Sequence, residues 1–413
     1  MKKIIQAALI SSLTITSQIS QAANPEPTLY GTVTHENGQS VTGSIRWGDQ
    51  ESFLSDIFNG EKLSTTGIEH LSDDEKEALE NHQPGPKAQI GGLAITFKSF
   101  FGKEIKLPKF NVHFGAIKKI EHSNGTFTVT LHDGSSFQTN DQHNDTSDEV
   151  FVLNTEGETT AYEIEDLSSI VFSAAPENAK TFNDGIYGTV NSELGTFYGR
   201  IMWDKDERTL SEKLDGNDES QEHDINFSAI KSIEKVNEGN AAKVELKDGN
   251  TLVLKGTNDV NNSNRGIWID NPETGRVEIK WQQFTKLNIE TVDVDWKSFN
   301  DYVAQAKKIS GTITLKDKQQ IKADALTFDL NQQSQAELFD ADMNGSNRQV
   351  PFKLIKKITQ KNKQAVELLM RNDQQMMAYG SRNVTQDNNG VLATINDKHQ
   401  WYQWEEIESI EFD

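Results

Sequence analysis

The sequence predicts an all-β protein of three tandem β units, each made of two SH3-like or Sm-like small-barrel halves. A motif that opens each unit and a Phe-centred segment that follows it predict the number of units. Tyr-Gly-Thr-Val at 30–33 recurs at 187–190 and, as Ser-Gly-Thr-Ile, at 310–313. The segment Phe-x-x-Ile-x-x-Ile begins at Phe114, Phe227 and Phe352. Self-similarity over such distances indicates repeated units.

A finer apolar pattern predicts how each half is built. Spacings of two place side chains on one face of a strand, and spacings of three suit a single 3₁₀ turn. Strand, helical turn and strand is how small SH3-like barrels close, although three larger β-sandwiches are the alternative. Spacings of two, three and three occur six times, at Val112/Phe114/Ile117/Ile120, Tyr162/Ile164/Leu167/Ile170, Ile225/Phe227/Ile230/Ile233, Ile279/Trp281/Phe284/Leu287, Val350/Phe352/Ile355/Ile358 and Tyr402/Trp404/Ile407/Ile410.

Each half also carries a dipeptide that predicts a hairpin turn. Gly in such a dipeptide supplies the positive φ of a tight turn. The last two of the six dipeptides lack Gly and predict looser turns. The dipeptides are Asn37-Gly38, Asp133-Gly134, Leu194-Gly195, Asp248-Gly249, Lys316-Asp317 and Asn372-Asp373.

The N-terminus predicts export. Lys2 and Lys3 precede an apolar stretch, and Ser20-Gln21-Ala22 provides the small residues that signal peptidase requires. We therefore expect residues 1–22 to be a signal peptide that is cleaved before Ala23, and a periplasmic or secreted protein. No later segment approaches the roughly 18 uninterrupted apolar residues of a spanning helix, so we expect no transmembrane segment in the mature chain.

The same features predict the domain boundaries. An amphipathic pattern of Trp296, Phe299, Val303 and Ala306 predicts a helix in the linker that precedes unit three. The expected ranges are 23–175 for unit one, 184–291 for unit two, 292–308 for the linker helix and 309–413 for unit three.

Composition excludes several classes of function. The 413 residues include no Cys, which removes disulfides, thiolate metal sites and cysteine catalysis. The formal net charge of −22 argues against nucleic-acid binding, which requires a basic surface.

Unit one departs from the other two through an insertion at 61–108. Ser72 and Glu75 form a capping-box pattern that predicts a short helix to about Asn81, before Pro84. The apolar run 91–101 follows, and it has two interpretations: a lid over an open barrel end, or a surface that docks a partner or apolar ligand.

Four histidines of unit one suggest a metal site. Alternation around Val112 and Phe114 directs His113 away from their core, where it could meet His122, His132 and His143 and bind a divalent metal through imidazole nitrogens. Their spacing does not match a known metal motif, so surface histidines on strands are the competing interpretation.

An Asn/Asp-rich loop at 256–267 is the densest polar stretch. Side-chain oxygens of Asn258, Asp259 and Asn264 are suited to Ca²⁺, with Arg265 beside them. Asn and Asp also satisfy their own backbone in turns. The ten-residue spacing from Gly256 to Gly266 recurs from Gly380 to Gly390, with different residues between the glycines. Fixed length with changing residues favours the structural role.

The same region carries a resemblance. Gly-Thr-Asn-Asp-Val-Asn-Asn-Ser-Asn-Arg-Gly-Ile at 256–267, and the Tyr-Gly-Thr-Val and Gly-x-Ile-x-Trp-Asp stretch of unit two, resemble a group of exported bacterial proteins of unknown function. The resemblance weakens in unit three, which lacks Trp-Asp and Asn-Arg-Gly. It implies a module without an assigned activity.

The leading functional hypothesis is an exported, non-catalytic binding or scaffold protein whose β units present loops or grooves to a protein or glycan. The sequence contains none of the common catalytic motifs. Trp268 alternates with Ile267 and Ile269, and so is a candidate stacking surface. The alternative is a hydrolytic or metal-binding enzyme centred on unit one. We expect no cofactor beyond a Ca²⁺ or transition-metal ion.

Overall fold

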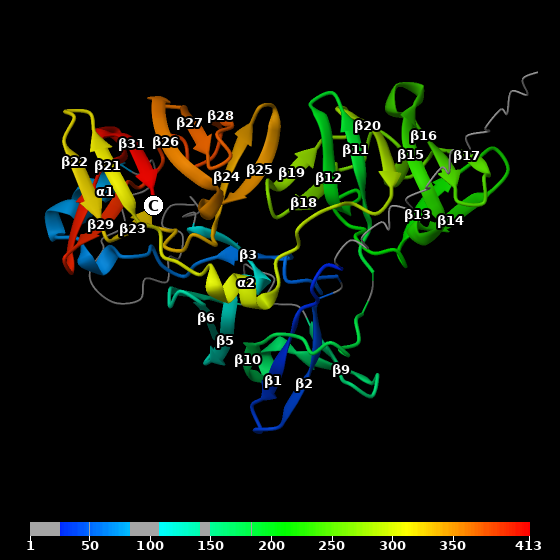
Figure 1. Cartoon of the computed structure of the whole chain (residues 1–413), viewed down its shortest axis with the longest axis horizontal. Coiled ribbons are helices and arrows are strands. Elements are labelled where there is room, and N and C mark those ends of the chain that lie inside the picture. The colour runs from blue at the N-terminus through cyan, green and yellow to red at the C-terminus, as the bar shows by residue number, and fades with distance from the viewer. Residues whose placement is uncertain (1–24, 49, 83–106, 141–148, 183) are drawn as a thin grey trace, which may run out of the picture.

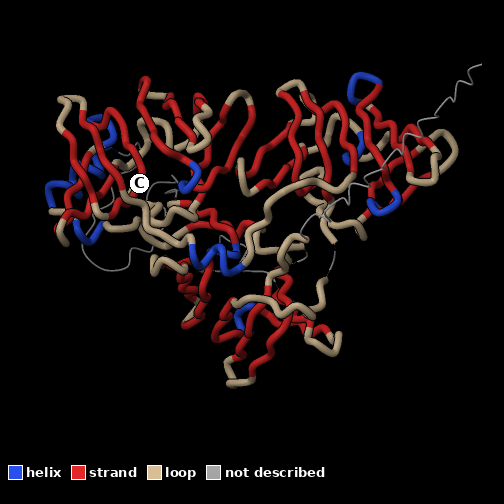
Figure 2. The backbone as a smooth tube through the Cα atoms, viewed as in Figure 1, coloured by secondary structure: helices blue, strands red, loops and turns tan. Residues whose placement is uncertain are grey.

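The computed structural model describes residues 25–48, 50–82, 107–140, 149–182 and 184–413. Strands make up most of these residues, with short helices between them (Figure 2). All the strand pairs are antiparallel, so the predicted all-β fold is confirmed. In the described part of the chain, no helix is both long and apolar enough to cross a membrane.

Unit one forms an eight-stranded sheet in the order β7-β6-β5-β10-β1-β2-β8-β9 and a separate hairpin, β3-β4. Its elements are β1 (Tyr30–His35), β2 (Ser40–Trp47), β3 (Ile57–Glu61), α1 (Asp73–His82), β4 (Lys109–His113), β5 (Ile117–Ser123), β6 (Thr126–Leu131), β7 (Ser136–Thr139), β8 (Glu149–Leu153), β9 (Thr159–Glu163) and β10 (Leu167–Phe172).

Unit two has the same strand order, β17-β16-β15-β20-β11-β12-β18-β19, and again a separate hairpin, β13-β14. Its elements are β11 (Tyr187–Ser192), β12 (Gly195–Met202), β13 (Lys213–Asn217), β14 (Glu222–Asn226), β15 (Ile230–Val236), β16 (Ala241–Leu246), β17 (Thr251–Leu254), β18 (Ile267–Asn271), β19 (Gly275–Ile279) and β20 (Phe284–Ile289). The linker α2 (Phe299–Ala304) follows.

Unit three differs in two ways. The strand that corresponds to β12 is broken at Asp324, and the hairpin that corresponds to β13-β14 joins the main sheet. Its elements are β21 (Gly311–Leu315), β22 (Gln320–Ala323), β23 (Ala325–Phe328), β24 (Leu338–Met343), β25 (Ser346–Pro351), β26 (Ile355–Asn362), β27 (Ala365–Met370), β28 (Gln375–Tyr379), β29 (Val391–Ile395), β30 (Lys398–Tyr402) and β31 (Ile407–Phe412).

Each unit has one hydrophobic core. The cores include Trp47 and Phe114 in unit one, Trp203 and Trp281 in unit two, and Phe328 in unit three. Both halves of a unit contribute to its core, and the described strands form open sheets. The SH3-like or Sm-like character of the halves therefore stays a prediction.

The six apolar patterns mark a 3₁₀ turn followed by a β-bulge. Five of the six contain a 3₁₀ turn at the first spacing of three, and the sixth has a turn in which Phe284 N–H reaches Lys280 and Trp281. At the second spacing, every following strand carries a register shift, as between Ile117 and Lys119. The bulge adds one residue, so side chains three apart share a face. The assignment of both spacings to one 3₁₀ turn was wrong for the second.

The six predicted hairpin turns are confirmed. The prediction of looser turns for the two dipeptides without Gly was wrong, because both turns close with the same main-chain bonds as the turn at Asn37-Gly38 and reach positive φ at other residues. The six turns join β1-β2, β6-β7, β11-β12, β16-β17, β21-β22 and β27-β28. Lys318 has a φ of 75° and Asp373 a φ of 65°.

The glycine in each opening motif is required by a close backbone approach. A Cβ on Gly31, Gly188 or Gly311 would lie 2.4, 2.2 or 2.2 Å from a carbonyl oxygen of the neighbouring strand. Such a contact cannot form without moving the backbone, which explains why this position is Gly in all three motifs.

Units one and two meet around a buried arginine of unit two. Arg200 of β12 is 1% exposed. Its guanidinium lies 2.6 Å from Asp56 of unit one, 3.1 Å from Glu26 of the N-terminal segment and 3.4 Å from Asp270 of β18. Burial raises the pKa of Glu26 to about 7 against the opposing effect of Arg200, and Tyr187 donates a hydrogen bond to its carboxyl group.

The described part of the insertion packs against unit three. Figure 1 shows α1 beside β22 and β29, far from β1 and β2 of its own unit. Leu71 and Leu79 contact Leu330, Leu392 and Trp401. This part of the insertion therefore covers unit three rather than its own unit. The apolar run 91–101 lies outside the described residues.

An ion pair strengthens this contact. Lys62, directly after β3, forms a buried 2.8 Å ion pair with Glu337 of unit three. Ser72 and Glu75 form the predicted capping box of α1, with Ser72 N–H 2.7 Å from the Glu75 carboxylate.

The close approach at Gly188 predicts a stability effect. We expect Gly188→Ala to lower the free energy of unfolding by about 1–3 kcal/mol, because the new Cβ pushes β20 away. Urea denaturation measures the change. Val253→Ala, at an exposed position on β17, is the control and should change it by less than about 0.5 kcal/mol. An unchanged unfolding midpoint for Gly188→Ala would contradict the packing argument.

The raised pKa of Glu26 predicts a pH effect. A carboxyl group with a raised folded pKa stabilises the fold at low pH, and this contribution is lost as the pH rises through about 7. Between pH 5 and 8, wild type should therefore lose about 1–3 kcal/mol more than Glu26→Gln, which resembles the protonated form. Denaturation at several pH values tests this, with exposed Glu163→Gln as the control. Parallel pH profiles for wild type and Glu26→Gln would refute it.

Candidate functional site

The Asn/Asp loop of unit two is anchored on one buried carboxylate. Asp204 accepts hydrogen bonds from the Arg265 main-chain N–H, from Arg265 Nε at 3.1 Å and from the Asn258 amide. Asn264 bridges the loop, since its amide donates to the Asp259 carbonyl and its oxygen accepts from Gly266. The Asp259 carboxylate in turn accepts Asp215 N–H at 2.7 Å.

Unit three builds its loop in the same way with different residues. Asp329 takes the place of Asp204 and accepts Asn389 N–H at 2.7 Å and Arg382 Nε at 3.2 Å. Asn388 bridges this loop as Asn264 does, and Asn383 accepts Asp340 N–H as Asp259 accepts Asp215 N–H. The residues proposed to bind a ligand (Asn258, Asp259, Asn264 and Arg265) therefore hold the loop together.

Trp268 is also engaged within the chain. Its ring lies 4.6 Å from the guanidinium carbon of Arg276 and 5.2 Å from Lys205 Nζ. Alternation placed it correctly opposite the buried Ile267 and Ile269. It is half-buried beside two cations, however, so it is not an open stacking surface.

The structure does not gather the histidines. His113 lies edge-on to Tyr302 of α2, with ring centroids 6.1 Å apart, so its side chain packs against α2. Burial, and then Lys353, lower its pKa to about 3.

The other histidines also contact aromatic rings. His122 stacks on Phe127 at 4.5 Å and His132 lies edge-on to Phe299 at 5.1 Å, while His143 is outside the described residues. Within the described ranges, no three His, Asp or Glu side chains are arranged to hold a metal ion.

The carboxyl group of Glu207 in unit two corresponds to the side-chain amide of Gln332 in unit three. Burial, and then the charge of Asp259, raise the pKa of Glu207 to about 8. Glu207 N–H closes a turn on the Trp203 carbonyl, and Gln332 closes the same turn on Phe328 in unit three. Because Gln serves at the corresponding position, this carboxyl group is not a catalytic candidate.

The candidate site is a groove of about 630 Å³ beside β30, which we call the β30 groove. Ala78, Leu315, Trp401 and Tyr402 supply its apolar surface. Its polar residues are Asp74 and Glu75 of α1, Lys316, Asp317 and Gln319 of the β21-β22 turn, and Gln400, Gln403 and Glu406 around the end of β30. The sequence predicted α1 but not the surface that it would cover, so the groove was missed.

A second cavity, of about 380 Å³, lies at the junction of the units. Glu26, Phe53, Tyr187 and Trp296 are among its lining residues. The Glu26 side chain is wholly buried and its carboxyl group bonds to Arg200, Ser55 and Tyr187. Because the carboxyl group of Glu26 is already bonded within the chain, the junction cavity is the weaker candidate for ligand binding.

The chain matches no family model, no curated protein and no solved structure.

The anchoring role of Asp204 predicts a local stability effect. We expect Asp204→Asn to lower the free energy of unfolding by about 1–3 kcal/mol, because an amide NH₂ replaces one acceptor that faces loop donors. Asp206→Asn is the matched control, since Asp206 bonds the same Arg265 from an exposed position.

Thermal melting with EDTA and then Ca²⁺ completes this test. The melting temperature should not depend on Ca²⁺ in either protein. A rise with Ca²⁺ that Asp204→Asn abolishes would restore a cation site in the loop.

Proposed function

We propose that this chain is an exported, non-catalytic binding or scaffold protein of tandem β units, which holds a protein or glycan partner in the β30 groove. One observation carries the proposal: the place that corresponds to the β30 groove in unit two is filled by the β24-β25 hairpin of unit three. The groove is thus a docking position that another segment of this chain uses elsewhere.

The lining of the groove supports binding. Apolar side chains from α1, β21 and β30 are flanked by amide and carboxylate groups. A concave surface of this mixed character provides both area to bury and hydrogen bonds that orient a ligand.

Export is supported by the basic start, apolar stretch and small residues that end at Ala22. The alternative of a metal-dependent or hydrolytic enzyme in unit one has less support, because His122, His132 and His113 contact Phe127, Phe299 and Tyr302.

Site-specific photo-crosslinking in the cells that make the protein tests the proposal. A benzophenone amino acid at Gln319, exposed in the groove, should give one discrete adduct, identified by mass spectrometry. The same group at exposed Val253 on β17 is the control and should give none. Equal labelling from both positions, or none from Gln319, would refute the groove as a binding surface.

A further inference from the structure

In unit two, the strand that corresponds to β30 is β19, and its outer edge pairs with a strand of unit three. There β25 pairs antiparallel with β19, with Arg276 opposite Gln349 and Val277 opposite Arg348. Two side-chain bonds support the pairing: Gln283 Nε2 donates to the Gly345 carbonyl at 3.0 Å, and Ser346 Oγ donates to the Glu278 carbonyl at 2.6 Å.

The surroundings of β19 and β30 correspond. Glu193 N–H, in the turn β11-β12, donates to the Gln283 carbonyl at 2.9 Å. Lys316 N–H, in the turn β21-β22, donates to the Glu406 carbonyl at the same distance. Since Lys316 and Glu406 both line the β30 groove, the groove occupies the position where the β24-β25 hairpin sits on unit two.

Backbone N–H and C=O groups of β30 point toward its outer edge. Asn396 and Asp397 form a two-residue turn with φ of 47° and 61°, so Ile395 and Lys398 are the hydrogen-bonded pair nearest the turn. Alternation then directs the backbone N–H and C=O of His399 and Trp401 toward the outer edge. In the part of the chain that the structure describes, no strand pairs with that edge.

Charge determines which segment fits. Among the described residues that line the groove, Asp74, Glu75, Asp317 and Glu406 are acidic and Lys316 is the one cation. Asp74 and Glu75 come from α1, which belongs to the insertion of unit one and lies beside β30 of unit three. Since unit two and unit three carry no such insertion, β19 has no equivalent pair of carboxylates beside it among the described residues. The whole chain is acidic as well, with a formal net charge of −22, so a basic segment is attracted both locally and at long range.

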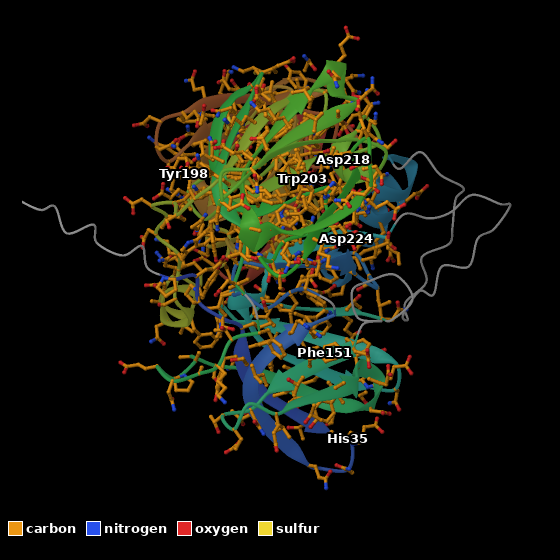
Figure 3. All side chains as sticks on the ribbon, turned by 90° about the vertical axis from the view of Figure 1, so that its right-hand side faces the viewer. His35, Phe151, Tyr198, Trp203, Asp218 and Asp224 are labelled. Carbon is orange, nitrogen blue, oxygen red and sulfur yellow. The ribbon has the colours of Figure 1, made fainter. Side chains whose placement is uncertain are left out.

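Other occupants fit less well. Trp401 and Tyr402 are 8% and 7% exposed, so neither ring offers an open face to a sugar. The hairpin β13-β14 of a second copy has the right shape, but it carries Asp218, Glu222 and Asp224 and would meet like charge. Figure 3 shows Asp218 and Asp224 on the side of unit two opposite Tyr198.

We propose that the β30 groove accepts an extended basic segment of a partner protein, which pairs antiparallel with β30 as β25 pairs with β19. The inference rests on the proposed binding function and names its ligand class. Strand addition supplies affinity through main-chain hydrogen bonds, and the acidic rim selects Lys and Arg side chains.

Fluorescence anisotropy with short labelled peptides tests this on the mature chain. The probe alternates Val and Lys. One comparison peptide replaces Lys with Glu, and a second keeps Lys but carries N-methyl groups on alternate amides. We expect both comparison peptides to bind at least about tenfold more weakly, since the first loses charge attraction and the second loses edge pairing.

Two variants locate the binding. His399→Pro removes an outward N–H and keeps the main-chain bonds to β29, which an edge strand tolerates, and should abolish binding. It also removes the contacts of the His399 ring with Thr394 and His70, which His399→Ala removes while it keeps the N–H and should keep binding. Asp74→Asn with Asp317→Asn should weaken binding about tenfold and reduce its salt dependence. The matched control is Asp248→Asn with Glu273→Gln, which removes two exposed carboxylates of unit two and should leave binding unchanged.

Several outcomes would overturn the inference. Equal binding of the N-methylated or the Glu peptide would exclude strand addition or basic selectivity. Dimers that His399→Pro abolishes would assign the groove to a second copy, and peptide binding only after deletion of 84–104 would assign it to that segment. If the peptides fail while the Gln319 crosslink persists, the proposed binding function stands and only the ligand class is wrong.

Discussion

The ion cluster around Arg200 holds the arrangement of the units together. A buried guanidinium is tolerated only when carboxylates surround it, and here they come from three parts of the chain: Glu26, Asp56 and Asp270. Arg276 and Arg208 are further partners of Asp270 and Asp56, so the charges form one network across the junction. Arg208, also in unit two, forms another ion pair across the junction, with its guanidinium 2.8 Å from the carboxylate of Glu51 in unit one. The relative position of units one and two therefore depends on electrostatics, whereas each unit depends on its own apolar core.

The geometry of the β30 groove follows from this cluster. Unit two fixes unit one through Arg200 and fixes unit three through the β19-β25 pairing. Unit one can then place α1 on unit three, where the Lys62–Glu337 pair and the contacts of Leu79 hold it. The groove thus needs all three units, although its lining comes from two of them.

The sequence predicted features that depend on residues close together in the chain, and it missed contacts between residues far apart in the chain. Apolar spacing and turn dipeptides report on neighbouring residues, so strands, turns and the α1 capping box were predicted correctly. The same alternation directed His113 away from its core, but it contains no information on Tyr302, which packs against that side chain. Likewise, the constant length of the Asn/Asp loops indicated a structural role. The anchors Asp204 and Asp329 lie too far along the chain to be recognised.

Sheet edges explain why the docking position at β30 is open, as is the outer edge of the corresponding strand of unit one, β9, among the described strands. When units pair edge to edge within one chain, the last sheet edge has no further strand of the chain to pair with. Such an unpaired edge can pair with another copy of the chain. The outer strand β14 carries Glu222 and Asp224, which oppose pairing between acidic chains. β30 instead presents the backbone of His399 and Trp401 inside a ring of carboxylates. Those carboxylates repel a second copy of this acidic chain and attract a basic strand. In the proposed binding mode, the charges that oppose pairing with a second acidic copy are the ones that favour a basic strand.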